Sequence, residues 1–234
     1  MTFDNFKWLN ESEAEYKDGV LKVYAPGHTD YFNSPVKENG AFPEPVANAP
    51  LYYTEVTGDF VFKAKGELEF VSTYDAAALL VYENENVWAK LALENSDMPC
   101  KMPAVISVVT NRISDDCNGP VRDANHVWFQ ISRVDDCFAF HYSTDGVEYN
   151  MVRVFTLPVG KTVKVGFEAQ SPMGEVDIGI LARFRWRIDG LPILEQASKR
   201  GSAKHFPSRK KDRRTTHAKF TKPCQFQRDY QGVF

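Results

Sequence analysis

The stretch "HVWFQISRVDDCFAFHYS", residues 126–143, decides the fold class because apolar side chains alternate with polar ones along both of its halves. In the first half, Val127, Phe129 and Ile131 are two residues apart, which places them on one face of an extended strand. The second half repeats the pattern with Phe138 and Phe140. The "VDD" segment between the halves is typical of a tight connector between paired strands. The stretch therefore predicts an antiparallel hairpin with one face in a core.

Similar short runs recur from residue 6 to about residue 170, separated by connectors such as "KDG", "ENEN" and "STDG". No window has a long amphipathic helical period, and no helices alternate with the strands, which argues against a parallel sheet. The sequence therefore predicts an all-β fold, a two-sheet antiparallel β-sandwich. The clearest runs begin at residues 19, 51, 58, 76, 86, 104, 126, 137, 148 and 161.

The chain of 234 residues divides into an acidic body and a basic C-terminal part. Residues 1–182 carry 14 Lys and Arg against 27 Asp and Glu, a net charge of −13, whereas residues 183–234 have a net charge of +10. We expect residues 1–190 to form one sandwich domain and residues 191–234 to be a basic, disordered extension. Because an acidic body repels phosphates, nucleic acid is not an expected partner.

No export or membrane signal is visible in the sequence. Residues 1–17 lack a basic start followed by an apolar segment, and no apolar run approaches the ~20 residues of a membrane span. The four cysteines form no CxxC pair and no zinc-ligand spacing, so no metal and no cofactor are expected. We therefore expect a cytoplasmic protein, which the basic cluster "RKKDRR" (209–214) would direct to the nucleus if it acts as a localisation signal.

The second face of four predicted strands is polar but carries aromatic rings. Flat rings beside planar amides and carboxylates suit sugars, whose C–H faces stack on aromatics while their hydroxyls form directional hydrogen bonds. We therefore expect one binding face for a carbohydrate or a sugar-derived metabolite. The alternative is a solvated face whose tryptophans pack beneath the proline-rich segment 27–50, since long loops often cover a sheet. The candidate ligand-binding residues are Trp88, Lys90, Glu94, Trp128, Gln130, His141, Glu168 and Gln170.

Glu94 and Glu168 are the candidate catalytic pair if the protein is an enzyme. Glycosidases use two carboxyl groups, about 5–5.5 Å apart for retention and about 6.5–9.5 Å apart for inversion. Both glutamates fall on the predicted polar face, but the sequence does not show whether their strands are neighbours. We expect a non-catalytic binding or regulatory module, with a glycoside hydrolase-like enzyme as the alternative.

A dense polar segment follows the strand predicted at 104–110. In "SVVTNRISDDCNG" (107–119), Asp115 and Asp116 precede an Asn-Gly pair that favours a tight turn, and adjacent acids lack the alternate spacing of a calcium loop. We expect the segment to be the turn at the end of the strand, with both aspartates on the rim of the binding face. Arg133 and Arg153, near strand ends, are further rim candidates that either clamp an anion or pair with nearby aspartates.

Several segments, in order, resemble a known family. The series "YDAAALLVYENENVWAKLALE", "ISVVTNRISDDCNG", "WFQISRVDDCFAFHYSTDG", "MVRVF" and "VGFEAQSPMG" resembles the regulation-of-enolase-type family, between about Trp8 and Gly174. The resemblance implies a concanavalin A-like β-sandwich (jelly roll) whose curved sheet presents a concave face. It also implies a link to carbohydrate metabolism through a glycolytic enzyme partner such as enolase, without established catalytic residues. After "AQSPMG", the segment "ARFRWRI" (182–188) is expected to supply the final strand.

Overall fold

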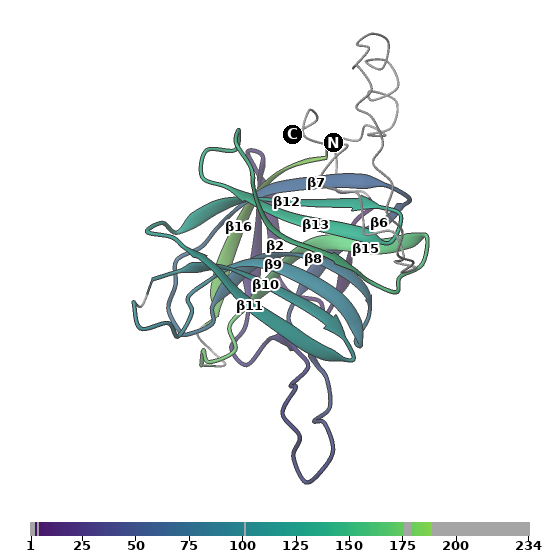
Figure 1. The fold of residues 1–234 in the computed structure, drawn as a ribbon. Helices are drawn as coiled ribbons and strands as arrows, with labels where there is room; N and C mark the ends of the chain where they lie inside the picture. The colour runs from purple at the N-terminus through teal and green to yellow at the C-terminus, as the bar shows by residue number, and fades with distance from the viewer. Residues whose placement is uncertain (1–2, 4, 101, 176–178, 189–234) are drawn as a thin grey trace, which may run out of the picture.

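The computed structural model describes residues 3, 5–100, 102–175 and 179–188, which form two seven-stranded antiparallel sheets (Figure 1). In spatial order, sheet A contains β1 (Lys7–Leu9), β6 (Leu51–Thr57), β15 (Thr162–Gln170), β8 (Ala76–Asn84), β9 (Val87–Glu94), β10 (Ala104–Asn111) and β11 (Ile113–Val121). Sheet B contains β14 (Asn150–Thr156), β13 (Cys137–Ser143), β12 (His126–Val134), β7 (Phe60–Glu67), β16 (Ile180–Ile188), β3 (Val20–Ala25) and β2 (Ala14–Lys17). The predicted all-β, two-sheet sandwich is confirmed.

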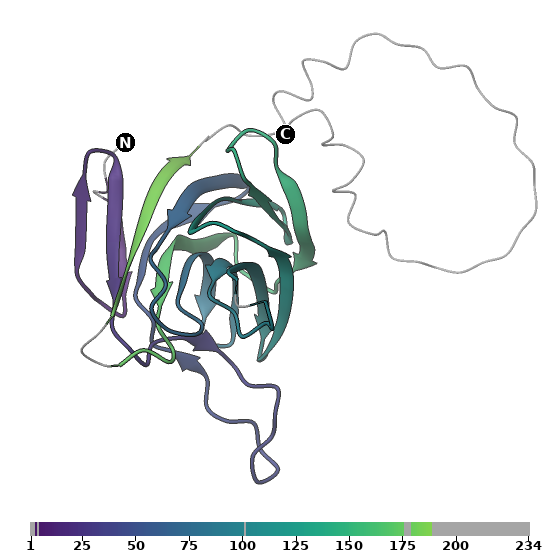
Figure 2. The same cartoon turned by 90° about the vertical axis from the view of Figure 1, so that its left-hand side faces the viewer.

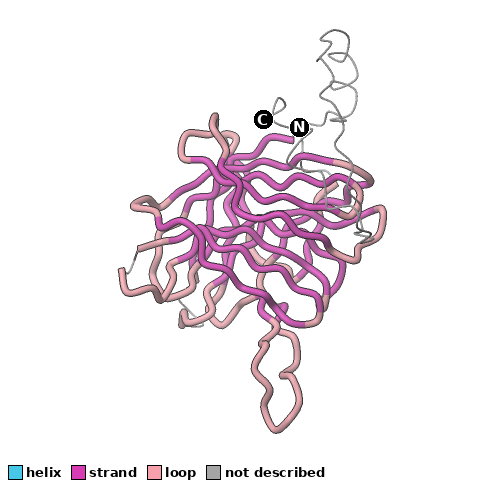
Figure 3. Tube along the Cα trace, viewed as in Figure 1, coloured by secondary structure: helices cyan, strands magenta, loops and turns pink. Residues whose placement is uncertain are grey.

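Strands and loops account for all of the described chain in Figure 3. A short ribbon of β4 (Tyr31–Phe32) and β5 (Val46–Ala47) lies in the segment between β3 and β6. The described residues contain no helix with the length and apolar character needed to cross a membrane. Each of the ten predicted runs overlaps one of the strands, which shows how strongly the period-2 pattern marks this fold.

The main core lies between the two sheets and follows the predicted alternation. Phe129 of β12 and Phe138 of β13 are fully buried in it. From sheet A, Phe167 contacts Phe62 and Phe184 of sheet B, with ring centroids 5.4 and 5.0 Å apart. Burying a phenylalanine side chain contributes about 1.5–3 kcal/mol, so this aromatic contact between the sheets is a major source of stability.

The stretch 126–143 is a hairpin, as predicted. β12 and β13 pair down to Val134 and Cys137, so only Asp135 and Asp136 form the turn. Asp135 has a left-handed backbone (φ 52°), a conformation that aspartate tolerates better than most residues. Its N–H donates to Asp59 Oδ1 at 2.9 Å. The "VDD" connector therefore sets the register of the two strands that flank it.

A second apolar layer covers the face of sheet A that points away from sheet B, which we call the outer face of sheet A. Tyr31 of β4 is fully buried there, in edge-to-face contact with Trp88 and Tyr82 at 5.7 and 6.1 Å between ring centroids. Ala49 and Leu51 are also buried in this layer. Residues 35–42 of the same segment are exposed, in the long loop that extends from the body in Figure 1 and Figure 2. The two ends of segment 27–50 therefore cover the sheet.

The polar segment predicted to be a turn is instead β11, the edge strand of sheet A. β10 and β11 join at Arg112, whose backbone is left-handed (φ 72°), so the turn precedes the aspartates. A Cβ at Gly119 would lie 2.5 Å from the carbonyl oxygen of Val105, at a register shift between Ala104 and Ile106, so this glycine marks a bulge. An edge strand has solvent on one side, which is why it tolerates adjacent charged residues.

β16 confirms the prediction that "ARFRWRI" supplies the final strand. It pairs with β3 on one side and β7 on the other, and Phe184 is buried in the main core. The predicted domain boundary at residue 190 and the predicted basic extension 191–234, with its "RKKDRR" cluster, lie outside the described residues.

Candidate functional site

The prediction of a single binding face is wrong, because the candidate residues lie on the two opposite sides of the sandwich. β9 and β15 belong to sheet A, whereas β12 and β13 belong to sheet B, and the polar side chains of each pair point away from the shared core. Alternation shows which side chains of a strand face the core, but not which sheet the strand joins. Trp88, Lys90, Glu94, Glu168 and Gln170 share the outer face of sheet A, and Trp128, Gln130 and His141 share that of sheet B.

The three candidates on sheet B form no pocket with the others. Gln130 is fully buried and donates from Nε2 to Ser132 Oγ at 3.2 Å. The indole ring of Trp128 packs against Gly146, where a Cβ would lie 2.8 Å from the ring. His141 is 5% exposed, and burial lowers its pKa to about 4, so the imidazole is neutral at pH 7. These side chains are part of the packed structure of sheet B.

Trp88 is a packing residue and not a platform for a ligand. Its side chain is completely buried beneath Tyr31. Its Nε1–H donates to the carbonyl oxygen of Glu85 at 3.2 Å, so the polar atom of the indole is also satisfied within the protein. The alternative interpretation of the sequence, a tryptophan packed under segment 27–50, is therefore correct for Trp88.

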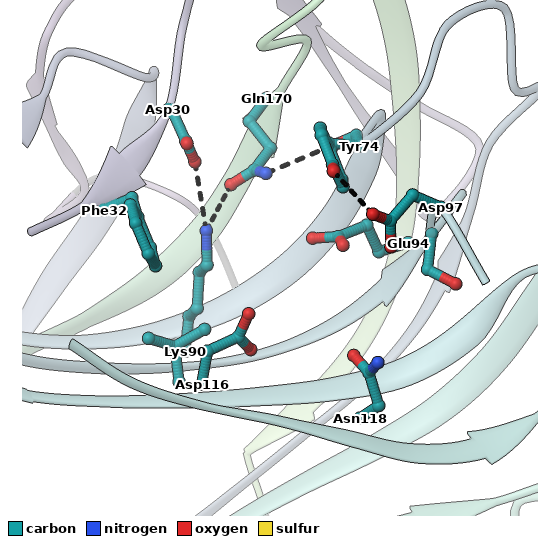
Figure 4. A pocket seen from close by; sticks show the side chains of 11 residues that line it. Asp30, Phe32, Tyr74, Lys90, Glu94, Asp97, Asp116, Asn118 and Gln170 are labelled. Carbon is teal, nitrogen blue, oxygen red and sulfur yellow. Dashed lines mark hydrogen bonds and ion pairs between the residues drawn. The ribbon is translucent and has the colours of Figure 1, made fainter. Parts of the chain in front are cut away.

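A polar pocket of about 340 Å³ lies on the outer face of sheet A, next to the start of segment 27–50 (Figure 4). Small side chains make room for it, since Ala76, Ala92 and Ala104 are buried on this face among the longer polar residues. In the cross-strand register, Gln170, Ala76, Glu94 and Ala104 form one row. The pocket is lined by Asp30, Phe32, Tyr74, Lys90, Glu94, Ser96, Asp97, Val108, Asp116, Asn118 and Gln170.

Lys90 joins segment 27–50 to the sheet at the wall of this pocket. Its Nζ donates to Asp30 Oδ1 at 3.2 Å, to the carbonyl oxygen of Tyr31 at 2.9 Å and to Gln170 Oε1 at 2.6 Å. An ammonium group has three N–H donors, so these acceptors use all of them. Burial favours a lower pKa for Lys90, but the surrounding carboxyl groups, Asp30 first, outweigh it and raise the pKa. Lys90 is therefore charged.

Two glutamates near Lys90 are harder to ionise than an exposed glutamate. Burial raises the pKa of Glu94 and of Glu168 to about 8, although Lys90 opposes the rise. Glu168 is fully buried, and neither of its carboxyl oxygens has a hydrogen-bond partner among the described residues. Glu94 is 8% exposed and lines the pocket. The two glutamates therefore differ in access, since only Glu94 lines the pocket.

The loop between β7 and β8 forms another wall. Tyr74 has a left-handed backbone (φ 68°), which is rare for an aromatic residue and costs about 1–3 kcal/mol. Three hydrogen bonds hold it: its N–H donates to Asn95 O (2.8 Å), its carbonyl oxygen accepts from Gln170 Nε2 (3.2 Å), and its hydroxyl donates to Asp97 Oδ2 (3.0 Å). Local strain of this kind is concentrated at binding sites. These contacts fix Tyr74 against the pocket in Figure 4.

Of the four predicted rim residues, only Asp116 lines the pocket. Asp115 pairs with Arg153 at 2.6 Å, and this ion pair joins the edge strand of sheet A to β14, the edge strand of sheet B. The guanidinium of Arg133 is buried and donates to three backbone carbonyl oxygens instead of a carboxylate. The predicted pairing of an arginine with a nearby aspartate is thus correct for Arg153 and wrong for Arg133.

Several pocket residues are not identified by the sequence pattern. Most lie in loops, where no periodicity indicates the direction of a side chain, and the wrong prediction of a turn hides Asn118. The available signals are the length of segment 27–50 and the polar run "ENSD" (94–97) that begins at the last residue of β9. The residues missed are Asp30, Phe32, Tyr74, Ser96, Asp97, Val108 and Asn118.

Comparison with known proteins places this fold in a family without giving it an activity. A family model described as "Protein of unknown function (DUF1349)" matches residues 8–188, from β1 to β16. No curated protein matches the sequence. The resemblance seen in the sequence is thus supported at the level of a family of unknown function, and nothing in the comparisons names regulation of enolase.

Solved structures share the fold at low sequence identity. A functionally unknown protein from Saccharomyces cerevisiae aligns with a TM-score of 0.71 and 20% identity, over 80% of this chain and 97% of its own. A variant of the GH43 protein BlXynB from Bacillus licheniformis has a TM-score of 0.54 and 15% identity, over 73% of this chain and 32% of its own. The Bacteroides ovatus xyloglucan PUL GH43B has a TM-score of 0.56 and 11% identity, over 79% of this chain and 37% of its own. This chain therefore spans about a third of the length of these GH43 proteins, and the likeness shows the fold alone.

Proposed function

Because the chain belongs to a family of proteins of unknown function (DUF1349), we propose its function from the pocket itself: a non-catalytic module that binds a small saccharide. The observation that carries the proposal is a preformed pocket of about 340 Å³ whose walls combine carboxyl, amide and hydroxyl groups with aromatic rings. Ligand pockets of roughly 300–1,000 Å³ are typical of small-molecule sites, so this one suits a monosaccharide or disaccharide.

The groups on the pocket walls match the groups on a sugar. Asp97 and Asp116 accept hydrogen bonds from hydroxyls, and a protonated Glu94 donates one. Phe32 and Tyr74 line the pocket as well and offer apolar surface to the C–H faces of a sugar ring. Polar and apolar contacts of this kind on one ligand are what distinguishes saccharide recognition from that of a purely charged or purely apolar molecule.

The geometry does not favour the alternative of a glycoside hydrolase-like enzyme. Glu94 lines the pocket, but Glu168 does not, and their strands are separated by β8, which places the strands about 10 Å apart. Burial raises the pKa of both carboxyl groups to about 8, which disfavours the ionised carboxylate that a nucleophile or base requires. Glu94 is therefore better suited to binding a ligand than to hydrolysis, and Glu168 lies outside the pocket.

Calorimetric titration with a panel of monosaccharides and disaccharides tests the proposal. We expect the wild-type protein to bind at least one of them and the change Asp116→Asn to weaken that binding about tenfold, because a charge-assisted hydrogen bond contributes about 1.5–3 kcal/mol. Asp116 belongs to β11, and it is the carboxyl group of that strand that lines the pocket.

The matched controls come from the same strand and from the other sheet. Asp115→Asn changes the neighbouring aspartate, which pairs with Arg153 and does not line the pocket, and Trp128→Ala changes the outer face of sheet B. Both variants are expected to bind as the wild type does. A loss of binding in Asp115→Asn equal to that in Asp116→Asn, or no binding of any saccharide by the wild type, would contradict the proposal.

Two finer expectations from the sequence stay predictions. They are the regulation of a glycolytic enzyme such as enolase and a cytoplasmic location. Affinity purification of the tagged chain from its own cells, with enolase measured in the eluate and fluorescence imaging of the same tag, tests both. Recovery of enolase by the wild type but not by an unrelated β-sandwich of similar charge would support the first.

A further inference from the structure

The pocket carries more negative than positive charge. Four acidic side chains line it, and Lys90 is the basic side chain that lines it within the described part of the chain. Because Lys90 donates its three N–H groups to Asp30, Tyr31 and Gln170, it has no donor left for a ligand. Within the described residues, no ion pair joins the remaining acids, Glu94, Asp97 and Asp116, to a basic side chain.

One buried polar atom at the same pocket has no partner among the described residues, and the carboxyl group beside it is open to the pocket. Glu94 is 8% exposed, and no hydrogen bond joins its carboxyl group to another described residue. Ser96 is 6% exposed, and its Oγ is buried without a hydrogen-bond partner. Both residues line the pocket. Since buried polar atoms almost always have partners, the Ser96 hydroxyl is available to a bound molecule, next to the open carboxyl group of Glu94.

A metal ion does not fit this arrangement. No group of three or more His, Cys, Asp or Glu side chains in the described residues converges closely enough to hold one. An ammonium group has different requirements, because its three N–H donors reach separate acceptors on different walls and tolerate longer separations between those acceptors. Aromatic rings add to the attraction for a cation, and Phe32 and Tyr74 both line the pocket.

We infer that the saccharide bound in this pocket is an amino sugar, with its protonated amine beside Glu94 and Asp97. The inference rests on the proposed saccharide binding and narrows the ligand class. Figure 4 shows Glu94 and Asp97 next to each other, across the pocket from the saturated Lys90. The same charges disfavour sugar phosphates and sugar acids, which would bring a second anion to the acids.

The pKa of Glu94 is consistent with this assignment. Burial raises it most, and the neighbouring Asp116, Asp30 and Asp97 raise it further, while Lys90 opposes them. A cation placed in the pocket would relieve the repulsion between these carboxyl groups and allow Glu94 to ionise. Neutral sugars would give no such relief.

Titration of the full chain at pH 7 with matched probes tests the inference. The probes are D-glucosamine, D-glucose, N-acetyl-D-glucosamine and D-glucose 6-phosphate. Glucosamine is the cationic probe, and N-acetyl-D-glucosamine keeps the nitrogen without the positive charge. We expect the Kd for glucosamine to be at least about tenfold below that for glucose, with the phosphate the weakest ligand. The change Asp97→Asn is expected to narrow the ratio of the two Kd values, and Asp115→Asn to leave it as in the wild type.

The outcomes separate the two proposals. Equal Kd values for glucosamine and glucose would overturn the amine inference and leave saccharide binding standing. Binding of none of the four probes would overturn both. A ratio that narrows equally in Asp97→Asn and Asp115→Asn, with both variants folded by circular dichroism, would also overturn the inference, because Asp115 lies outside the pocket.

Discussion

Replacing Lys90 with methionine is expected to destabilise the protein by about 3–5 kcal/mol, because it removes one partner of a buried ion pair. Methionine keeps an unbranched apolar side chain but provides none of the three N–H donors. Asp30 loses its cation, and the Tyr31 carbonyl oxygen and Gln170 Oε1 each lose a donor. Lys90 is 2% exposed, so water does not easily replace its bonds to Tyr31 and Gln170, although it reaches Asp30, whose side chain is 25% exposed.

Urea denaturation measures the change in the free energy of unfolding, and hydrogen exchange shows where it acts. Exchange should accelerate at residues 30–33 and 47–49, the parts of the segment that lie on sheet A. The matched control is Lys22→Met, since Lys22 donates to Glu15 at 2.6 Å in an exposed pair that contributes less than about 1 kcal/mol. If the two variants lost equal stability, Lys90 would not be what holds the segment in place.

The sequence predicts the strands of this protein well because period-2 alternation is a local property. Each strand of the 126–143 hairpin shows its inward face in its own residues, and the left-handed Asp135 agrees with the "VDD" connector. The same local pattern predicts β16 from "ARFRWRI". In these segments the neighbours along the chain carry enough information to decide the outcome.

Sheet membership depends on contacts between distant parts of the chain, and there the sequence pattern is not sufficient. Trp88 and Trp128 have the same relation to their apolar neighbours, yet they lie on opposite sides of the sandwich. β11 shows a related limit, because its acidic residues have low strand propensity but tolerate an edge that faces solvent. A single sequence does not show which strand will be an edge.

The pocket was only partly predictable for the same reason. Lys90, Glu94 and Gln170 lie on strands, where alternation places them on the polar face. Tyr74 and Asp97 come from loops, and a left-handed backbone helps to place Tyr74. Such positions follow from closure of the loops over the sheet, which no short-range pattern encodes.

The second large effect concerns pH. We expect the folded wild-type protein to lose stability as the pH rises from about 4.5 to about 8, and Glu168→Gln to lose less. Burial raises the pKa of Glu168 from 4.5 to about 8, so between these values the folded state holds a proton that the unfolded state releases. Each group of this kind lowers the free energy of unfolding by about 1.4 kcal/mol per pH unit in that window. The pKa of Glu94 is raised in the same way, so in Glu168→Gln the stability still falls with pH through Glu94, but less steeply than in the wild type.

Glutamine resembles the protonated acid in shape and cannot ionise, so Glu168→Gln should match the wild type near pH 4.5 and exceed its stability at pH 8 by on the order of 4 kcal/mol. Denaturant unfolding from pH 5 to pH 8.5 measures the two slopes. Glu55→Gln is the control, because Glu55 is exposed on β6, next to β15. The free energy of unfolding of this variant should change with pH as steeply as that of the wild type. Identical slopes in Glu168→Gln and the wild type would mean that Glu168 is ionised in the folded protein. That result would place one more negative charge beside Lys90 and would contradict the rise of the Glu168 pKa through burial.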